Sequence, residues 1–189
     1  GRRFTKPIRA WVAGVTGIAV RDTPQRYLCG TPQVESDRGT GFIPRDRLGN
    51  CSLAHGYAGL FDTIQAKHIS GGISTCSMKT YEQGRTKFQA DTLDLVWLDE
   101  EPPMDIYSES YTRLATTGGL MLCTFTPLFG MSEVVMRYLQ EPSPDREWVN
   151  MTLDDAEHIP AAERARIIAG YPAHEREARA KGIPMLGSG

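Results

Sequence analysis

Residues 95–102 have the sequence LVWLDEEP, in which a run of apolar side chains ends in three consecutive acids and a proline. A short apolar run of this kind is typical of a strand buried inside a parallel sheet. Asp99 and Glu100 would then lie at the carboxyl end of the strand, which is the edge where open α/β sheets bind their ligands. The stretch therefore predicts a polar site at the end of a buried strand.

A second apolar stretch, residues 120–127 with the sequence LMLCTFTP, ends in two threonines and a proline. Thr124 and Thr126 lie two positions apart, so both hydroxyls would project to the same side of the strand end. Two strands in succession with polar ends favour the core of a P-loop ATPase. There Asp99 would hold Mg²⁺, Glu100 would orient or deprotonate the attacking water, and the threonines would contact the γ-phosphate.

Simpler interpretations exist for both stretches. Acidic loops exposed to solvent are common after strands, and threonine is favoured at sheet edges for its shape alone. Glu101 is expected to point away from Glu100, because successive strand residues alternate between the two faces of a sheet. The combination of the two stretches is what favours the ATPase interpretation.

The composition is that of an ordinary soluble globular protein of 189 residues, with 40% hydrophobic and 23% charged residues. No apolar run approaches the roughly 18 residues of a membrane span, so no membrane association is expected. The four cysteines show no paired spacing, which predicts free thiols and a reducing compartment.

The net charge of −2 hides an asymmetry along the chain. Residues 1–90 carry 13 Lys and Arg against 6 Asp and Glu, whereas residues 91–150 carry 3 against 11. The basic first part would suit contact with the phosphates of a nucleotide or nucleic acid. An even scatter of these charges over a solvated surface is the equally acceptable alternative.

Alternating strand and helix patterns predict an α/β fold, a three-layer sandwich with a mostly parallel sheet, and the two polar strand ends indicate the P-loop NTPase type. The expected strands are residues 10–15, 95–99, 120–124 and 148–153, with a β-hairpin around Gly71-Gly72 and a long loop over residues 30–50. The expected helices are residues 21–28, 105–115, 132–139, 160–170 and 172–182.

The chain contains no Gly-x-x-x-x-Gly-Lys-Ser/Thr loop, the motif that cradles phosphates in P-loop enzymes. The predicted fold is therefore incomplete, without the strand that bears this Walker A loop. Arg85 lies just before the acid-tipped strand and would serve as an arginine finger, while Arg21 would contact nucleic acid or an adjoining subunit. A solvated surface role is the alternative for either arginine.

The chain resembles the large terminase subunit of tailed bacteriophages, the motor that packages viral DNA. The strongest similarity lies in residues 79–85 (KTYEQGR), 93–103 (LDLVWLDEEPP), 124–135 (TFTPLFGMSEVV) and 174–189 (HEREARAKGIPMLGSG), and the first 60 residues support it. In that family a Walker A loop comes before this region and a nuclease domain comes after it. The resemblance implies that residues 1–158 form part of the ATPase domain and that residues 159–189 form a helical tail leading towards the nuclease domain.

The resemblance also implies roles and partners. The family's magnesium ligand falls on Asp99, its catalytic glutamate on Glu100, and its coupling motif on residues 124–127. ATP and Mg²⁺ are the implied cofactors. Double-stranded DNA, a homo-oligomeric ring, the portal protein and the small terminase subunit are the implied partners, in the host cytoplasm and transiently at the procapsid.

Two rival interpretations remain open at this level. A DExx-box helicase or another P-loop ATPase would carry the same acids, and a non-enzymatic α/β interaction module would merely resemble such a strand. The piece alone is expected to be inactive, because it lacks the phosphate-binding loop.

Overall fold

A six-stranded sheet with the order β2-β3-β4-β1-β5-β6 is the centre of the computed structural model, which describes residues 3–31 and 34–184. Residues 1–2 and 185–189 belong to the stretches that resemble the terminase family, and they lie outside the described residues. The strands are β1 (Arg9–Gly14), β2 (Leu48–Leu53), β3 (Phe61–Lys67), β4 (Ile73–Thr80), β5 (Leu95–Asp99) and β6 (Leu120–Thr124).

Four neighbouring strands of this sheet, β4, β1, β5 and β6, run parallel, as the sequence predicts. The predicted hairpin is also present, since β3 and β4 pair antiparallel on either side of Gly71-Gly72, where both glycines have positive φ. Because the four parallel strands share one direction, their carboxyl ends lie along a common edge.

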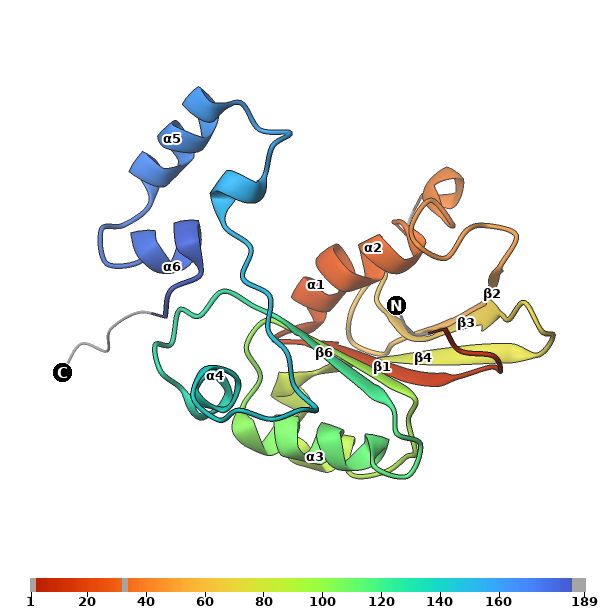
Figure 1. The fold of residues 1–189 in the computed structure, drawn as a ribbon. Helices are drawn as coiled ribbons and strands as arrows, with labels where there is room; N and C mark the ends of the chain where they lie inside the picture. The colour runs from red at the N-terminus through yellow and green to blue at the C-terminus, as the bar shows by residue number, and fades with distance from the viewer. Residues whose placement is uncertain (1–2, 32–33, 185–189) are drawn as a thin grey trace. The chain divides into compact units, whose positions relative to one another are not determined.

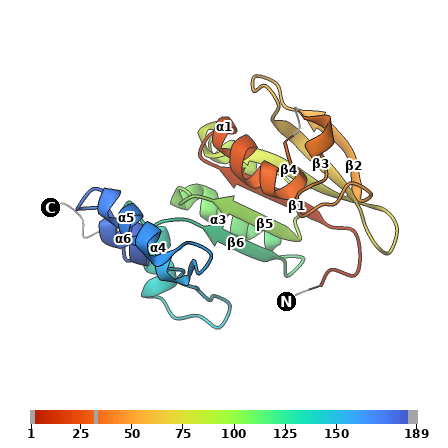
Figure 2. The same ribbon diagram turned by 90° about the horizontal axis from the view of Figure 1, so that it is seen from above.

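Helices cover both faces of the sheet, which gives three layers (Figures 1 and 2). On one face lie α1 (Gly17–Val20), a π-helical turn over Arg21–Gln25, and α2 (Arg26–Cys29), while α3 (Met104–Leu114) covers the other. Thr16 caps α1 by accepting a hydrogen bond from the backbone of Ala19. The π turn contains Pro24, which lacks a backbone N–H and so cannot continue the α-helical pattern.

The alternation of side chains along β1 divides the core between the two faces. Val12 packs into a cluster with Val20, Ile64 and Met78 on the side of α1 and α2. Its neighbour Trp11 points to the opposite face and meets the Phe88 ring edge-on, with ring centroids 5.6 Å apart. Both clusters are almost fully buried, so the strand end is carried on a rigid base.

The four cysteines are free thiols, as the sequence predicts. Burial raises the pKa of Cys29 and of Cys76 to about 12, so both stay protonated at neutral pH. Within the described residues, no helix combines the length and apolar character that a membrane span requires.

Two predictions about the elements were wrong. Residues 30–50 do not remain a loop throughout, because β2 begins at Leu48 and pairs with β3 through irregular register. Residues 148–153 do not form a strand, since Thr152 donates its backbone N–H and its hydroxyl to the Asp155 carboxylate and turns the chain. Apolar residues in this stretch, Val149 and Met151, are highly exposed and have no partner strand.

The packing of the chain divides it into two compact units, Gly1–Thr124 and Phe125–Gly189. The second unit holds α4 (Glu133–Leu139), α5 (Ala161–Gly170) and α6 (Arg176–Lys181). Ser132 caps α4 as predicted, by accepting a hydrogen bond from the backbone of Val135. The last helix begins four residues later than Pro172, after a turn, and ends at Gly182 in the left-handed conformation.

Candidate functional site

The carboxyl ends of β5 and β6 bring Asp99 and Thr124 together. The two residues are opposite each other in the parallel register, and the Thr124 hydroxyl donates a hydrogen bond of 2.8 Å to Asp99 Oδ1. The predicted pair of polar strand ends is therefore a direct side-chain contact. Asp99 is half-buried and Thr124 is exposed, so the pair faces outward at the edge of the sheet.

Burial raises the pKa of the Asp99 carboxyl above its usual range, and the hydrogen bond from Thr124 opposes this shift only in part. The ionised carboxylate is thus held where water solvates it poorly. A nearby cation would stabilise this charge, as bound divalent ions do at carboxylate sites.

A third side chain, Trp97, completes the contact. Its indole Nε1–H donates a 2.8 Å hydrogen bond to the Thr124 hydroxyl. Trp97 lies two residues before Asp99 and therefore on the same face of β5. No role for Trp97 was predicted from the sequence, although the two-residue alternation of side chains along a strand would have placed it beside Asp99.

Glu100 leaves the strand with an unusual backbone conformation, at φ +63°. This left-handed region is rarely occupied by residues other than glycine, asparagine and aspartate. The conformation turns the chain directly after Asp99, and the Glu100 side chain is exposed. Its backbone N–H donates to the Thr124 carbonyl oxygen at 2.8 Å, so the turn is tied to the end of β6.

Tyr81 supports the same turn from the end of β4. Its hydroxyl lies 3.0 Å from both the Asp99 and the Glu100 carbonyl oxygens and is the donor to them. The Tyr81 ring is buried, and burial raises its pKa, so the hydroxyl keeps its proton. Tyr81 lies within residues 79–85, but nothing in that sequence pattern predicts which backbone oxygens it meets. Glu101, the third acid, is buried.

Arg85 lies in the 3-10 turn Arg85–Phe88, where its Nε donates to Glu109 of α3 at 3.1 Å. The Glu109 carboxylate is largely buried and is also paired with Arg113 at 2.8 Å. The structure therefore associates Arg85 with α3, while its side chain remains 57% exposed. No described contact joins Arg85 to Asp99.

Thr126, the other predicted nucleotide contact, is half-buried and belongs to the second compact unit. Its carbonyl oxygen accepts a hydrogen bond from the backbone of Leu128. The common direction of the Thr124 and Thr126 hydroxyls stays a prediction.

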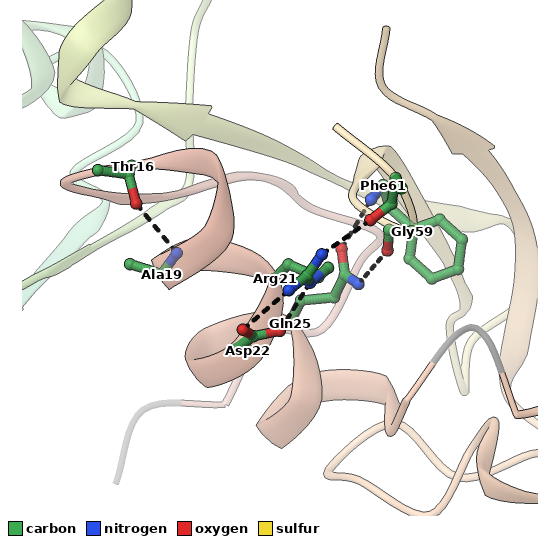
Figure 3. Close-up of polar contacts among 8 residues, drawn as sticks. Thr16, Ala19, Arg21, Asp22, Gln25, Gly59 and Phe61 are labelled. Atoms are coloured by element: carbon green, nitrogen blue, oxygen red, sulfur yellow. Dashed lines mark hydrogen bonds and ion pairs between the residues drawn. The ribbon is translucent and has the colours of Figure 1, made fainter. Parts of the chain in front are cut away.

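The helix that follows β1 is tied to the loop before β3 by two side chains (Figure 3). Gln25 is fully buried; its amide donates to the Gly59 carbonyl and accepts from the Phe61 N–H. Arg21 pairs with Asp22 at 2.6 Å and donates to the Ala58 carbonyl, so its guanidinium is bound within its own chain.

The residues at the end of β5 could hold a magnesium ion in the way that proteins bind this ion beside a nucleotide. Among the described residues, no group of three or more His, Cys, Asp or Glu side chains forms an all-protein metal site. Mg²⁺ beside nucleotides is usually held by one or two carboxylates together with phosphates and waters. The contact with Thr124 occupies one Asp99 oxygen, and the other would be directed at the cation.

The chain is similar to known proteins of one family. Residues 34–189 match the model of the family described as terminase large subunit, T4likevirus-type, N-terminal. The chain is 44% identical over 194 residues to the terminase large subunit of Salmonella phage P22, covering all of this chain and 39% of that protein. It is 37% identical over 182 residues to that of Enterobacteria phage LP7, covering 94% of this chain and 38% of that one.

Solved structures show the same fold. The large terminase of a thermophilic bacteriophage superimposes with a TM-score of 0.72 at 17% identity, over 97% of this chain and 42% of that one. A structure of the same phage's enzyme in complex with ADP gives a TM-score of 0.67 at 16% identity, over 95% and 40%. The chain thus spans about two fifths of the length of its relatives, and it belongs to the family of bacteriophage large terminase subunits.

Proposed function

We propose that this chain is the central part of the ATPase of a phage DNA-packaging motor, and that its nucleotide site is built around the contact between Asp99 and Thr124. Family membership supports this function, and the ADP complex of the thermophilic phage's enzyme supports nucleotide binding by the same fold. The helicase and interaction-module alternatives find no support among the relatives.

In the proposed site Asp99 holds the magnesium ion that accompanies ATP. The ion would neutralise charge on the phosphates as the terminal P–O bond breaks. Asp99 suits this role because it is half-buried, poorly solvated and fixed by Thr124. Thr124 would in turn sense the presence of the cation and the γ-phosphate, since its hydroxyl is already engaged with the metal-binding carboxylate. Thr126 is proposed as the second hydroxyl that contacts the nucleotide.

Glu100 is proposed to orient the attacking water and accept its proton. Its backbone is left-handed and its side chain is exposed, whereas Asp99 is half-buried, so the two adjacent acids can serve two different tasks. Arg85 is proposed to act as the arginine finger, with Glu109 holding Nε and the rest of the exposed guanidinium directed at a neighbouring subunit.

The wider setting is proposed from the family. The full-length protein would translocate double-stranded DNA as a homo-oligomeric ring, in contact with the portal protein and the small terminase subunit. It would work in the host cytoplasm and transiently at the procapsid. Residues 1–158 would belong to the ATPase domain and residues 159–189 to the tail leading towards a nuclease domain. Residues 1–189 alone are expected to hydrolyse ATP at background rates, because no Gly-x-x-x-x-Gly-Lys-Ser/Thr loop is present to cradle the phosphates.

The decisive variant for this function is Glu100→Gln in the full-length protein. The amide keeps the size of the side chain and removes its ability to accept a proton, so we expect steady-state ATP turnover to fall by at least about 100-fold. Nucleotide binding, measured with a fluorescent ATP analogue, should stay within about threefold of the wild type. Turnover close to that of the wild type would refute the proposed role.

A further inference from the structure

Trp97 stands out from its neighbours on β5 by its exposure and by its polar contact. Val96 and Leu98 are fully buried against the α3 side of the sheet, whereas Trp97 is only half-buried. The N–H of a buried indole usually finds a hydrogen-bond partner. Here the indole N–H is directed to a side-chain hydroxyl at the strand end, 2.8 Å away.

The ring of Trp97 is held in place by the core. It packs against the cluster that contains Val12 and Met78, beneath α1 and α2. Its register partner on β6 is Leu122, and the indole reaches further along that strand to Thr124. The fixed ring therefore places its N–H at the edge of the sheet without depending on any ligand.

The direction of the hydrogen bonds follows from the chemistry of the three groups. An indole N–H can only donate, and an ionised carboxylate can only accept, while a threonine hydroxyl can do both. Because the Thr124 oxygen accepts from Trp97, its single proton is available for Asp99 Oδ1. A Thr124 hydroxyl without the indole would be free to rotate and to donate to water instead.

We propose that Trp97 is a positioning residue of the metal–nucleotide site, which fixes the Thr124 hydroxyl as a donor to Asp99 and thereby orients the Asp99 carboxylate towards the cation. This inference rests on the proposed function. It extends that function by one residue that acts through Thr124 and touches neither metal nor nucleotide. Partners that orient a metal ligand commonly change metal affinity by about 10- to 100-fold when they are removed.

The test measures binding rather than turnover, using Mn²⁺ with ADP and the full-length protein. Free Mn²⁺ is followed by electron paramagnetic resonance for Trp97→Phe, Thr124→Val and the double variant. We expect each single variant to bind Mn²⁺–ADP about tenfold more weakly than the wild type. The double variant should be no weaker than Thr124→Val alone, because both changes interrupt one chain of hydrogen bonds.

Matched controls separate this role from general packing. Trp148→Phe removes an indole from an exposed position of the second unit and should leave binding unchanged. Thr124→Ser keeps the hydroxyl and should recover part of the Mn²⁺–ADP binding that Thr124→Val loses. Trp97→Tyr also lacks the indole N–H and replaces Trp97→Phe if that variant does not fold.

Three results would overturn the inference. If a folded Trp97→Phe or Trp97→Tyr protein binds Mn²⁺–ADP as tightly as the wild type, the positioning role of Trp97 is refuted and the proposed function is unaffected. Losses that multiply in the double variant would show that Trp97 acts through packing, independently of Thr124. A wild-type protein that binds no Mn²⁺–ADP at all would overturn the proposed function together with this inference.

Discussion

Glu100 carries backbone strain at the position proposed for catalysis. A left-handed conformation costs a residue with a side chain about 1–2 kcal/mol, and such strain persists only where surrounding contacts enforce it. Here the Tyr81 hydroxyl, from the 3-10 turn after β4, and the Thr124 carbonyl, at the end of β6, hold the turn. The strain is consistent with a residue placed for chemistry rather than for stability.

Replacing Glu100 by glycine or by alanine separates the effect of the side chain on catalysis from the effect of the backbone strain on stability. Glycine adopts positive φ without penalty, whereas alanine keeps the strain. We expect Glu100→Gly to be about 1 kcal/mol more stable than Glu100→Ala in urea denaturation, although both lose ATP turnover. Equal stabilities would mean that the backbone at residue 100 is not held at positive φ in solution.

Asp99 should likewise lower the stability of the nucleotide-free protein. Its folded pKa is raised above the value of the unfolded chain, so the fold favours the protonated form. Above the raised pKa the ionised carboxylate makes the folded state less stable. Asp99→Asn is therefore expected to raise the melting temperature at pH 7, on the order of 1–2 °C.

The raised pKa of Asp99 also determines how the difference in melting temperature between Asp99→Asn and the wild type depends on pH. As the pH falls through the raised folded pKa towards the ordinary value of 3.8, the wild type gains its proton and the advantage of Asp99→Asn should vanish. Melting curves of both proteins without Mg²⁺ or nucleotide, recorded from pH 7 downwards, make the measurement. A difference that persists unchanged to the lowest pH would contradict this assignment.

Residues whose position follows from strand periodicity were predictable from the sequence. Asp99 and Thr124 end two apolar runs, and their contact follows once the runs are parallel neighbours. Trp97 was within reach of the same reasoning. Tyr81 was not, because its partners are backbone oxygens of another strand, and no sequence pattern encodes such a long-range contact.

At the scale of elements, helices with explicit caps were predicted best. Ser132 at the start of α4 and Gly182 after α6 are local signals that need no tertiary context. The missed strand β2 contains Gly49 and Asn50, which disfavour strands, and it forms because β3 offers it a partner. The prediction of a strand at residues 148–153 was wrong for the opposite reason, because the side chains there favour a strand but no other strand pairs with them.

Gln25 holds the helical segment before it to the loop that leads into β3. Gln25→Leu would leave the half-buried Gly59 carbonyl and the buried Phe61 N–H without their side-chain partner, although the apolar side chain has a similar size. We expect a loss of about 2–4 kcal/mol in the free energy of unfolding. The exposed neighbour Thr23, changed to alanine, should alter stability by less than about 0.5 kcal/mol. Similar losses in the free energy of unfolding for both variants would show that the hydrogen bonds of the buried Gln25 amide do not stabilise the fold.

For the whole chain, the sequence predicted the α/β class and the parallel direction of the central strands. It did not predict the order of the strands, because parallel neighbours are joined by long connections that carry little information about adjacency. That order matters for function, since it places β5 between β1 and β6 and so puts Asp99 beside Thr124. The family resemblance supplied the functional interpretation, and the fold brings two of the predicted side chains, Asp99 and Thr124, into contact.

The proposed site is tested most directly by a crystal structure of the full-length protein with Mg²⁺ and a non-hydrolysable ATP analogue. We predict the Asp99 carboxylate in the coordination shell of the ion, directly or through one water, with Thr124 still at its side. Glu100 should lie within about 3 Å of a water in line with the γ-phosphate. A magnesium ion held by other residues, with Asp99 and Glu100 more than about 8 Å from the γ-phosphate, would contradict the central claim.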